Sequence, residues 1–124
     1  MDIIHTAIWV SDLDEARAFF VDALGLEETW SFELDGVENV YVGGEHGEIQ
    51  LRHAPDHEKP DPDRSDIDHI AVSVDDVEAV TERMVEETGC TVVDGPMVNE
   101  PASSYIAFIE GPDGYVVELV EPLD

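Results

Sequence analysis

The stretch "HTAIWVSDLDEARA" (residues 5–18) recurs later in the chain as "HIAVSVDDVEAVTE" (residues 69–82). Both copies begin with alternating apolar residues, which is typical of a strand. Both then reach an aspartate at a helix-capping position, followed by a helical apolar pattern. Four residues match between the copies: His5 with His69, Ala7 with Ala71, Val10 with Val74, and Asp12 with Asp76. The chain is therefore expected to be a duplicated structure.

Glycine and proline signals divide each half further. Gly25 and Gly89 are expected to end the two helices, and later turn signals, such as Asp35-Gly36 and Gly95-Pro96, separate short strands. Each half therefore reads β-α-β-β-β. We expect an α+β fold in which two βαβββ modules form a curved mixed sheet around a central cup. The expected division of the single domain, residues 1–124, is module one 1–54, a polar, proline-rich linker 55–65, and module two 66–124.

The composition restricts the class of protein. Acidic residues number 31 against 5 Lys plus Arg, a formal net charge of -26, so nucleic acid and anionic membranes are not expected partners. Hydrophobic residues make up 43% of the chain, which argues against a disordered acidic tail. Cys90 is the single cysteine, which excludes an internal disulfide and suits a reducing compartment. We expect a cytoplasmic protein of a salt-loving, halophilic cell.

The last strand of each half carries a polar residue at a matching position. Gln50 in "GEIQLRH" (residues 47–53) aligns with Glu118 in "YVVELVE" (residues 115–121). An ionised glutamate among buried apolar residues is costly unless it is paired or binds a metal. Side chains alternate along a strand, so His5 and His69 are expected on the face that the helices do not cover.

Each of these four residues has a plainer explanation by itself, such as a hydrogen-bonded histidine or a glutamate paired with arginine. Their recurrence at matched places in a repeat favours a common role. Two imidazoles, a carboxylate and an amide oxygen suit a divalent ion such as Ni, Co, Zn, Mn or Fe. We therefore expect one divalent metal ion bound by four residues: His5, Gln50, His69 and Glu118.

Three stretches resemble the vicinal oxygen chelate superfamily (glyoxalase, bleomycin resistance, extradiol dioxygenase), and within it short glyoxalase I (lactoylglutathione lyase). They are "IIHTAIWVSDLDEARAFFVDALGL" (residues 3–26), "IDHIAVSVDD" (67–76) and "YIAFIEGPDGYVVELVEP" (105–122). The resemblance carries the family's metal ligands to the same four residues. It also implies a homodimer, with each metal site formed within one chain or shared between two.

The resemblance further implies a reaction. The hemithioacetal of a 2-oxoaldehyde and a thiol becomes a 2-hydroxyacyl thioester through a metal-chelated enediolate, with Glu118 as both ligand and catalytic base. Arg52 shares the face of Gln50 and is the candidate for binding an anionic group of this thiol adduct or thioester substrate. Arg52 could equally neutralise Glu48.

Departures from the glyoxalase pattern keep alternatives open. Bacterial glyoxalases usually have Glu in the place of Gln50, whereas methylmalonyl-CoA epimerases resemble this chain in having Gln there. For an epimerase, Glu33 is a weak candidate as an additional base. Trp9 and Ala54 replace an Arg and an Asn expected to bind glutathione, so the identity of the thiol is left open. An Fe(II) extradiol dioxygenase ranks lower, because a fourth ligand leaves too few positions for both catecholate and oxygen. A fosfomycin-resistance-type enzyme and a non-catalytic ligand-binding protein complete the alternatives.

The salt-loving character is directly testable. At about 1 M salt the Debye length is roughly 3 Å, which screens the repulsion among the acidic side chains. We expect the melting temperature to rise between dilute buffer and molar KCl, and a gain of about 1 kcal/mol corresponds to roughly 3–6 °C for a chain of this size. Thermal melts followed by circular dichroism measure this shift. A melting temperature that stays constant or falls would contradict the expectation.

Overall fold

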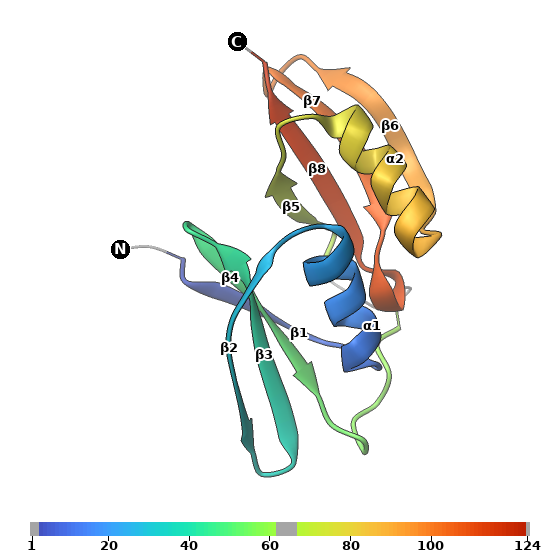
Figure 1. Cartoon of the computed structure of the whole chain (residues 1–124). Coiled ribbons are helices and arrows are strands. Elements are labelled where there is room, and N and C mark those ends of the chain that lie inside the picture. Colours follow the sequence, from blue (N-terminus) through green and yellow to red (C-terminus); the bar gives the residue numbers. More distant parts are fainter. Residues whose placement is uncertain (1–2, 62–66, 124) are drawn as a thin grey trace. The chain divides into compact units, whose positions relative to one another are not determined.

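The computed structural model describes residues 3–61 and 67–123. The chain divides into two compact units, Met1–Asp61 and Pro62–Asp124. Each unit is a β-α-β-β-β module with one four-stranded mixed sheet (Figure 1), which confirms the predicted α+β class. The described part of the expected linker, from Pro55 to Asp61, contains no helix or strand.

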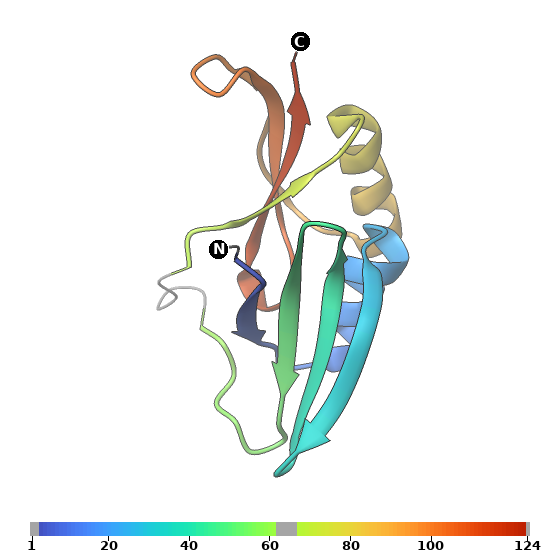
Figure 2. The same ribbon diagram turned by 90° about the vertical axis from the view of Figure 1, so that its left-hand side faces the viewer.

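Module one has a sheet of strand order β1-β4-β3-β2, in which β1 runs parallel to β4 and the other neighbours are antiparallel. Figure 2 shows β4, β3 and β2 side by side with the helical segment on one face. The elements are β1 (His5–Trp9), α1 (Leu13–Arg17), the π-helical η1 (Ala18–Ala23), β2 (Glu27–Leu34), β3 (Val37–Gly44) and β4 (Gly47–His53).

Module two repeats this arrangement with strand order β5-β8-β7-β6, and β5 runs parallel to β8. Its single α-helix packs against β6, β7 and β8. The elements are β5 (Ile70–Ser73), α2 (Val77–Thr88), β6 (Val92–Asn99), β7 (Ser104–Glu110), the 3-10 turn η3 (Pro112–Gly114) and β8 (Val116–Pro122).

Both predicted helix starts and the predicted end of α2 are confirmed by the structure. The carboxylate of Asp12 accepts from the backbone N–H of Glu15 at 3.0 Å, and that of Asp76 accepts from Ala79 at 3.1 Å. Gly89 follows α2 in the left-handed conformation, φ 70°, which a residue without Cβ adopts at low cost. The aspartates therefore satisfy N–H groups that the first helical turn leaves unpaired.

Strand register confirms the sequence repeat at the level of single residues. Ala7 pairs with Gln50 across β1 and β4, and Ala71 pairs with Glu118 across β5 and β8. The two alanines are matched residues of the repeat, so Gln50 and Glu118 occupy the same place in the two modules.

Two expectations need correction. The first helix is not uniform: α-helical geometry ends at Arg17 and the chain continues as a π-helix, which keeps Phe19 and Phe20 buried at 4% and 0% exposure. Side-chain alternation along the first strand predicts Ile4 on the helix-covered face beside Ile8, yet Ile4 is 70% exposed, whereas Ile8 is 2% exposed. Ile4 lies just before β1 begins, outside the paired strand.

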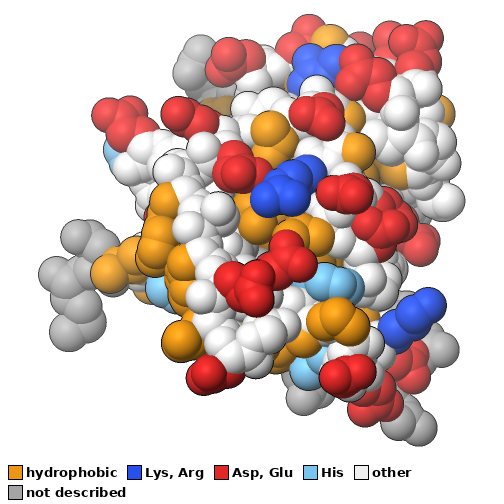
Figure 3. Space-filling view, turned by 60° about the horizontal axis from the view of Figure 1, so that its bottom comes forward, with side chains coloured by type: hydrophobic (Ala, Val, Ile, Leu, Met, Phe, Trp, Pro, Cys, Tyr) orange, Lys and Arg blue, Asp and Glu red, His pale blue; other side chains and the backbone are white. Residues whose placement is uncertain are grey.

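The surface follows the composition. The face drawn in Figure 3 carries acidic side chains spread over it, with few basic ones among them. Within the described residues, no helix is long and apolar enough to cross a membrane.

The helix caps make a quantitative prediction. Asp76→Ala leaves a first-turn N–H of α2 without its side-chain partner, and we expect the free energy of unfolding to fall by about 1 kcal/mol. Asp75→Ala is the matched control, because it removes the same charge from the adjacent position. Urea unfolding in molar KCl measures both variants. Equal losses would mean that charge, rather than the cap, accounts for the effect.

Candidate functional site

The face of the module-one sheet opposite the helical segment carries the first two predicted ligands. Strand alternation and register place His5 and Ala7 of β1 on this face together with Glu48 and Gln50 of β4. Gln50 lies between Ala7 on one side and Tyr41 of β3 on the other. The structure thus brings His5 and Gln50 to one surface of adjacent strands.

Aromatic side chains support His5 and Gln50. The ring of Tyr41 contacts the imidazole of His5 edge to face, with centroids 5.3 Å apart, and the indole of Trp30 stacks on Tyr41 at 4.5 Å. Tyr41 is 6% exposed, whereas Trp30 on the edge strand β2 is 53% exposed. Such stacked pairs restrict ring orientation, so His5 rests against an ordered surface.

Gln50 is held by a buried amide. Its Nε2 donates to Oδ1 of Asn39 at 2.9 Å, and Nε of Arg52 donates to the same oxygen at 3.1 Å. Asn39 is 2% exposed, and its own Nδ2 donates to the carbonyl of Val37 at 3.2 Å. The amide of Gln50 and the guanidinium of Arg52 therefore share one fixed acceptor.

Arg52 also contacts an aromatic surface. Its guanidinium carbon lies 4.6 Å from the ring centroid of Trp9, which is its cross-strand neighbour, and Trp9 stacks on His57 at 3.6 Å. The carboxylate of Glu48 accepts a hydrogen bond from the hydroxyl of Thr29. Arg52 is therefore oriented by Asn39 and Trp9, while Glu48 bonds to Thr29.

Module two holds the other two predicted ligands in direct proximity. Nε2 of His69 lies 3.3 Å from Oε1 of Glu118, and Nδ1 of His69 lies 2.7 Å from Oδ2 of Asp68. The ring of Phe108 contacts His69 edge to face at 5.6 Å. The Glu118 side chain is 14% exposed, between the fully buried Val117 and Leu119. The carboxylate predicted to be costly in this strand therefore has a histidine partner.

The two modules repeat this set of three side chains. Each has a histidine at the start of the parallel strand or directly before it, an aromatic ring against this histidine, and a Gln or Glu that pairs with the aromatic residue across the strands. The sets are His5, Tyr41 and Gln50 in module one, and His69, Phe108 and Glu118 in module two.

The donor chemistry of these sets fits a cation. A ring nitrogen of His69 and a carboxylate oxygen of Glu118 lie 3.3 Å apart, and both kinds of atom bind divalent ions, while Asp68 contacts the other ring nitrogen as orienting carboxylates do in metal-bound histidines. Among residues 3–61 and 67–123, no three His, Cys, Asp or Glu side chains gather in a metal-binding cluster. The four-residue metal site thus stays a prediction.

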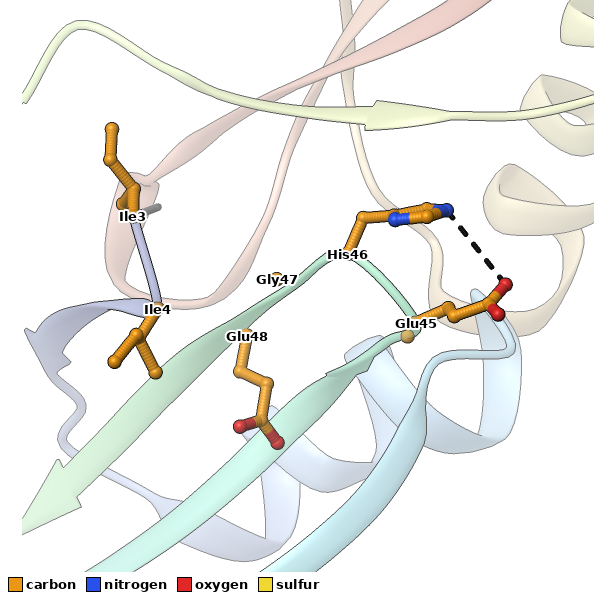
Figure 4. Close-up of a pocket in the computed structure, with 7 residues that line it drawn as sticks. Ile3, Ile4, Glu45, His46, Gly47 and Glu48 are labelled. Carbon is orange, nitrogen blue, oxygen red and sulfur yellow. Dashed lines mark ion pairs between the residues drawn. The ribbon is translucent and has the colours of Figure 1, made fainter. Parts of the chain in front are cut away.

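Module one has a hollow that borders this surface and another at the start of α1. One of about 390 Å³ at the β3–β4 turn is lined by Ile3, Ile4 and residues 44–48, with His46 and Glu45 forming an exposed ion pair (Figure 4). The other, of about 410 Å³, lies at the start of α1 between Arg17 and His53. Both are open, and Glu48 lines the first hollow and shares a sheet face with Gln50.

Sequence reasoning missed the residues that orient the predicted ligands. Asp68 directly precedes His69, a signal that a carboxylate can reach the ring. Asn39 has no comparable local signal, because its role depends on strand pairing.

In module two the hydroxyl of Tyr105 donates to Glu78 at 2.8 Å, and this hydrogen bond, together with desolvation, raises the pKa of Tyr105 above its usual value. Tyr105 therefore stays protonated at neutral pH, and its hydroxyl connects β7 to α2 through Glu78.

Comparison with known proteins identifies the relatives of this chain. Residues 2–119 match a family model described as the Glyoxalase/Bleomycin resistance protein/Dioxygenase superfamily. A probable lactoylglutathione lyase of Synechocystis is 32% identical, over 98% of this chain and 95% of its own. A lactoylglutathione lyase of Haemophilus influenzae is 34% identical, over 98% of this chain and 93% of its own.

Solved structures agree on the fold. Glyoxalase I from Zea mays superposes with a TM-score of 0.85 at 23% identity, covering 99% of this chain and 45% of the maize chain. At this identity the likeness establishes the fold, and this chain spans a little under half of the maize protein.

Proposed function

Because the chain belongs to the glyoxalase/bleomycin resistance protein/dioxygenase superfamily, we propose that it is a divalent-metal-dependent lyase of the glyoxalase I type. Its substrate is the hemithioacetal of a 2-oxoaldehyde and a thiol, and its product is a 2-hydroxyacyl thioester. Relatives named lactoylglutathione lyase, at 32% and 34% identity over nearly the whole chain, support the reaction class.

One divalent ion, of Ni, Co, Zn, Mn or Fe, is bound by four residues in this proposal: His5, Gln50, His69 and Glu118. The observation that carries it is the 3.3 Å approach of Nε2 of His69 to Oε1 of Glu118, in the place that corresponds to Gln50 in module one. Each module supplies two donors, so a four-ligand site needs both pairs. They come from one chain or from the two chains of a homodimer.

Glu118 is proposed as the catalytic base. A bound divalent ion supplies positive charge that stabilises negative charge developing on the adjacent substrate oxygens. Glu118 accepts the proton of the carbon that bears sulfur and returns it to the neighbouring carbon. The hydroxyl proton passes from the oxygen of the first carbon to that of the second, so the reaction has no net change in protons or electrons. The amide of Gln50 cannot accept this proton, which leaves Glu118 as the carboxylate of the ligand set.

Arg52 is proposed to bind an anionic group of the substrate. Its Nε donates to Asn39, and its guanidinium lies against Trp9. Within the described residues no hydrogen bond or ion pair engages its terminal nitrogens, which suit a carboxylate or phosphate. A guanidinium fixed in this way pays less entropy on binding than a free side chain.

A second candidate is an epimerase that moves a proton α to an acyl-CoA thioester. The neutral ligand Gln50, in place of the carboxylate usual in bacterial glyoxalases, is the observation that favours it. Parallel assays with methylglyoxal plus several thiols, and with a methylmalonyl-CoA-type thioester in deuterated water, distinguish the two. Thioester formation supports the lyase, and solvent deuterium at the α carbon supports the epimerase.

Glu118→Gln tests the central residue. We expect kcat to fall by at least about 100-fold, because general-base catalysis contributes roughly 10²–10⁴. Metal affinity should fall by at least about tenfold, since even partners outside the ligand shell are worth about 10–100-fold. Elemental analysis and calorimetric titration of protein purified without an affinity metal, together with thioester formation, measure these changes.

The matched control is Glu110→Gln, which neutralises an exposed carboxylate at the end of β7. It should retain the metal content and activity of the starting protein, about one divalent ion per chain. A Glu118→Gln variant that keeps full activity and affinity would refute the role of Glu118. A starting protein that binds no divalent ion would refute the four-ligand site.

Arg52→Ala tests the substrate contact. We expect KM for an anionic thiol adduct to rise by about tenfold with a smaller change in kcat, because a charge-assisted hydrogen bond is worth about 1.5–3 kcal/mol. Arg52→Lys keeps the charge but loses the Nε bond to Asn39. Its KM should lie between those of the starting protein and Arg52→Ala. An unchanged KM in both variants would exclude Arg52 from substrate binding.

A further inference from the structure

A buried asparagine lies beside the proposed metal ligand of module one. Asn39 is 2% exposed, and its Oδ1 accepts from Nε2 of Gln50 and from Nε of Arg52. Its Nδ2 donates to the carbonyl of Val37. The side chain is thus hydrogen-bonded through both ends of its amide.

The orientation of Asn39 does not depend on Gln50. A guanidinium can only donate hydrogen bonds and a backbone carbonyl can only accept them, so Arg52 requires an oxygen from Asn39 and Val37 requires an N–H. Both partners select the same amide orientation. Asn39 therefore presents an acceptor to residue 50, whichever way the amide of Gln50 is turned.

The consequence for Gln50 is a choice between its two amide ends. Only its NH₂ group can bond to the acceptor of Asn39, so its Oε1 is left for another partner. The oxygen is also the amide atom that binds a metal, because the NH₂ nitrogen has no available lone pair. We propose that Asn39 is a positioning residue that presents the oxygen of Gln50 to the divalent ion, an inference that rests on the proposed function.

Module two provides an internal comparison. Asn39 pairs with Arg52 across β3 and β4, and the corresponding pair across β7 and β8 is Ile106 with Val120. The ligand there is Glu118, whose two carboxylate oxygens are equivalent as metal donors. A carboxylate ligand needs no choice of end, and apolar residues occupy these places. The polar pair of Asn39 and Arg52 thus occurs in the module whose proposed ligand is the amide Gln50.

The same geometry accounts for an amide at position 50. A carboxylate there would place an oxygen against Oδ1 of Asn39, and Arg52 and Val37 oppose any turn of Asn39 that would relieve this contact. Asn39 therefore favours Gln over Glu at position 50 when the metal is absent, and its effect on metal binding depends on which of the two residues is present.

A double-mutant cycle tests this dependence. Co(II) affinity is measured by calorimetry and by the visible absorption of the bound ion, in the starting protein, Asn39→Leu, Gln50→Glu and the double variant. We expect Asn39→Leu to lower Co(II) affinity about three- to tenfold when residue 50 is Gln, the cost of leaving one side chain unoriented. With Glu at position 50, the same substitution should leave affinity unchanged or raise it.

Ile106→Val is the matched control, because it alters the corresponding position of module two. It should not change Co(II) affinity in either background. Asn39→Asp keeps an acceptor for Gln50 and should restore most of the affinity that Asn39→Leu loses. Thermal melts confirm that each variant is folded.

The outcomes separate the two proposals. Equal loss of affinity on Asn39→Leu in both backgrounds, or no loss with Gln50, would overturn the positioning role while leaving the metal site intact. Failure of the starting protein to bind Co(II) would overturn both.

If Asn39→Leu does not fold, hydrogen exchange in the starting protein tests the positioning role. Slow hydrogen exchange of the Gln50 side-chain N–H, identified by its loss in Gln50→Ala and seen with and without Zn(II), supports the role. Exchange at the rate of a free amide would overturn it.

Discussion

The register of the two parallel strand pairs is the constraint on which the other features depend. In each module a strand leads into a helix, and the last strand returns beside the first. The pairing of Ala7 with Gln50, and of Ala71 with Glu118, places a histidine and its amide or carboxylate neighbour on one face of each sheet. A slip of one residue would turn these polar groups toward the helix and expose the aliphatic core residues instead.

This register also explains how a carboxylate persists in a strand as apolar as β8. Glu118 alternates with Val117 and Leu119, which face the core and are fully buried, while its own side chain meets His69. Oε1 of Glu118 lies 3.3 Å from Nε2 of His69, and Nδ1 of the same imidazole lies 2.7 Å from Asp68, so the carboxylate has a polar partner that Asp68 orients. In module one the corresponding residue is the amide Gln50, and the buried Asn39 is its orienting partner.

The two modules have therefore diverged in how they hold equivalent side chains. In module two, the carboxylates of Asp68 and Glu118 lie on either side of one imidazole. Module one relies on neutral amides and a guanidinium, with aromatic rings beside them. In a chain with a net charge of -26, a neutral residue at position 50 limits the negative charge that a shared ligand set would concentrate. Arg52 is then the local positive group on the face of Gln50.

The sequence by itself determined the duplication, the β-α-β-β-β order, the capping aspartates and the pairing of Gln50 with Glu118 as equivalent positions. These features depend on local patterns, such as alternation, caps and turn glycines, that are contiguous in the chain. The π-helical continuation after Arg17, the exposure of Ile4 and the bonds of Asn39 and Asp68 came from the tertiary structure. Asn39 and Gln50 belong to neighbouring strands, and the hydrogen bond that orients the amide forms only when strand pairing brings them together. Side-chain partners across strands depend on register, rotamer and burial at once, and no single stretch of sequence encodes all three.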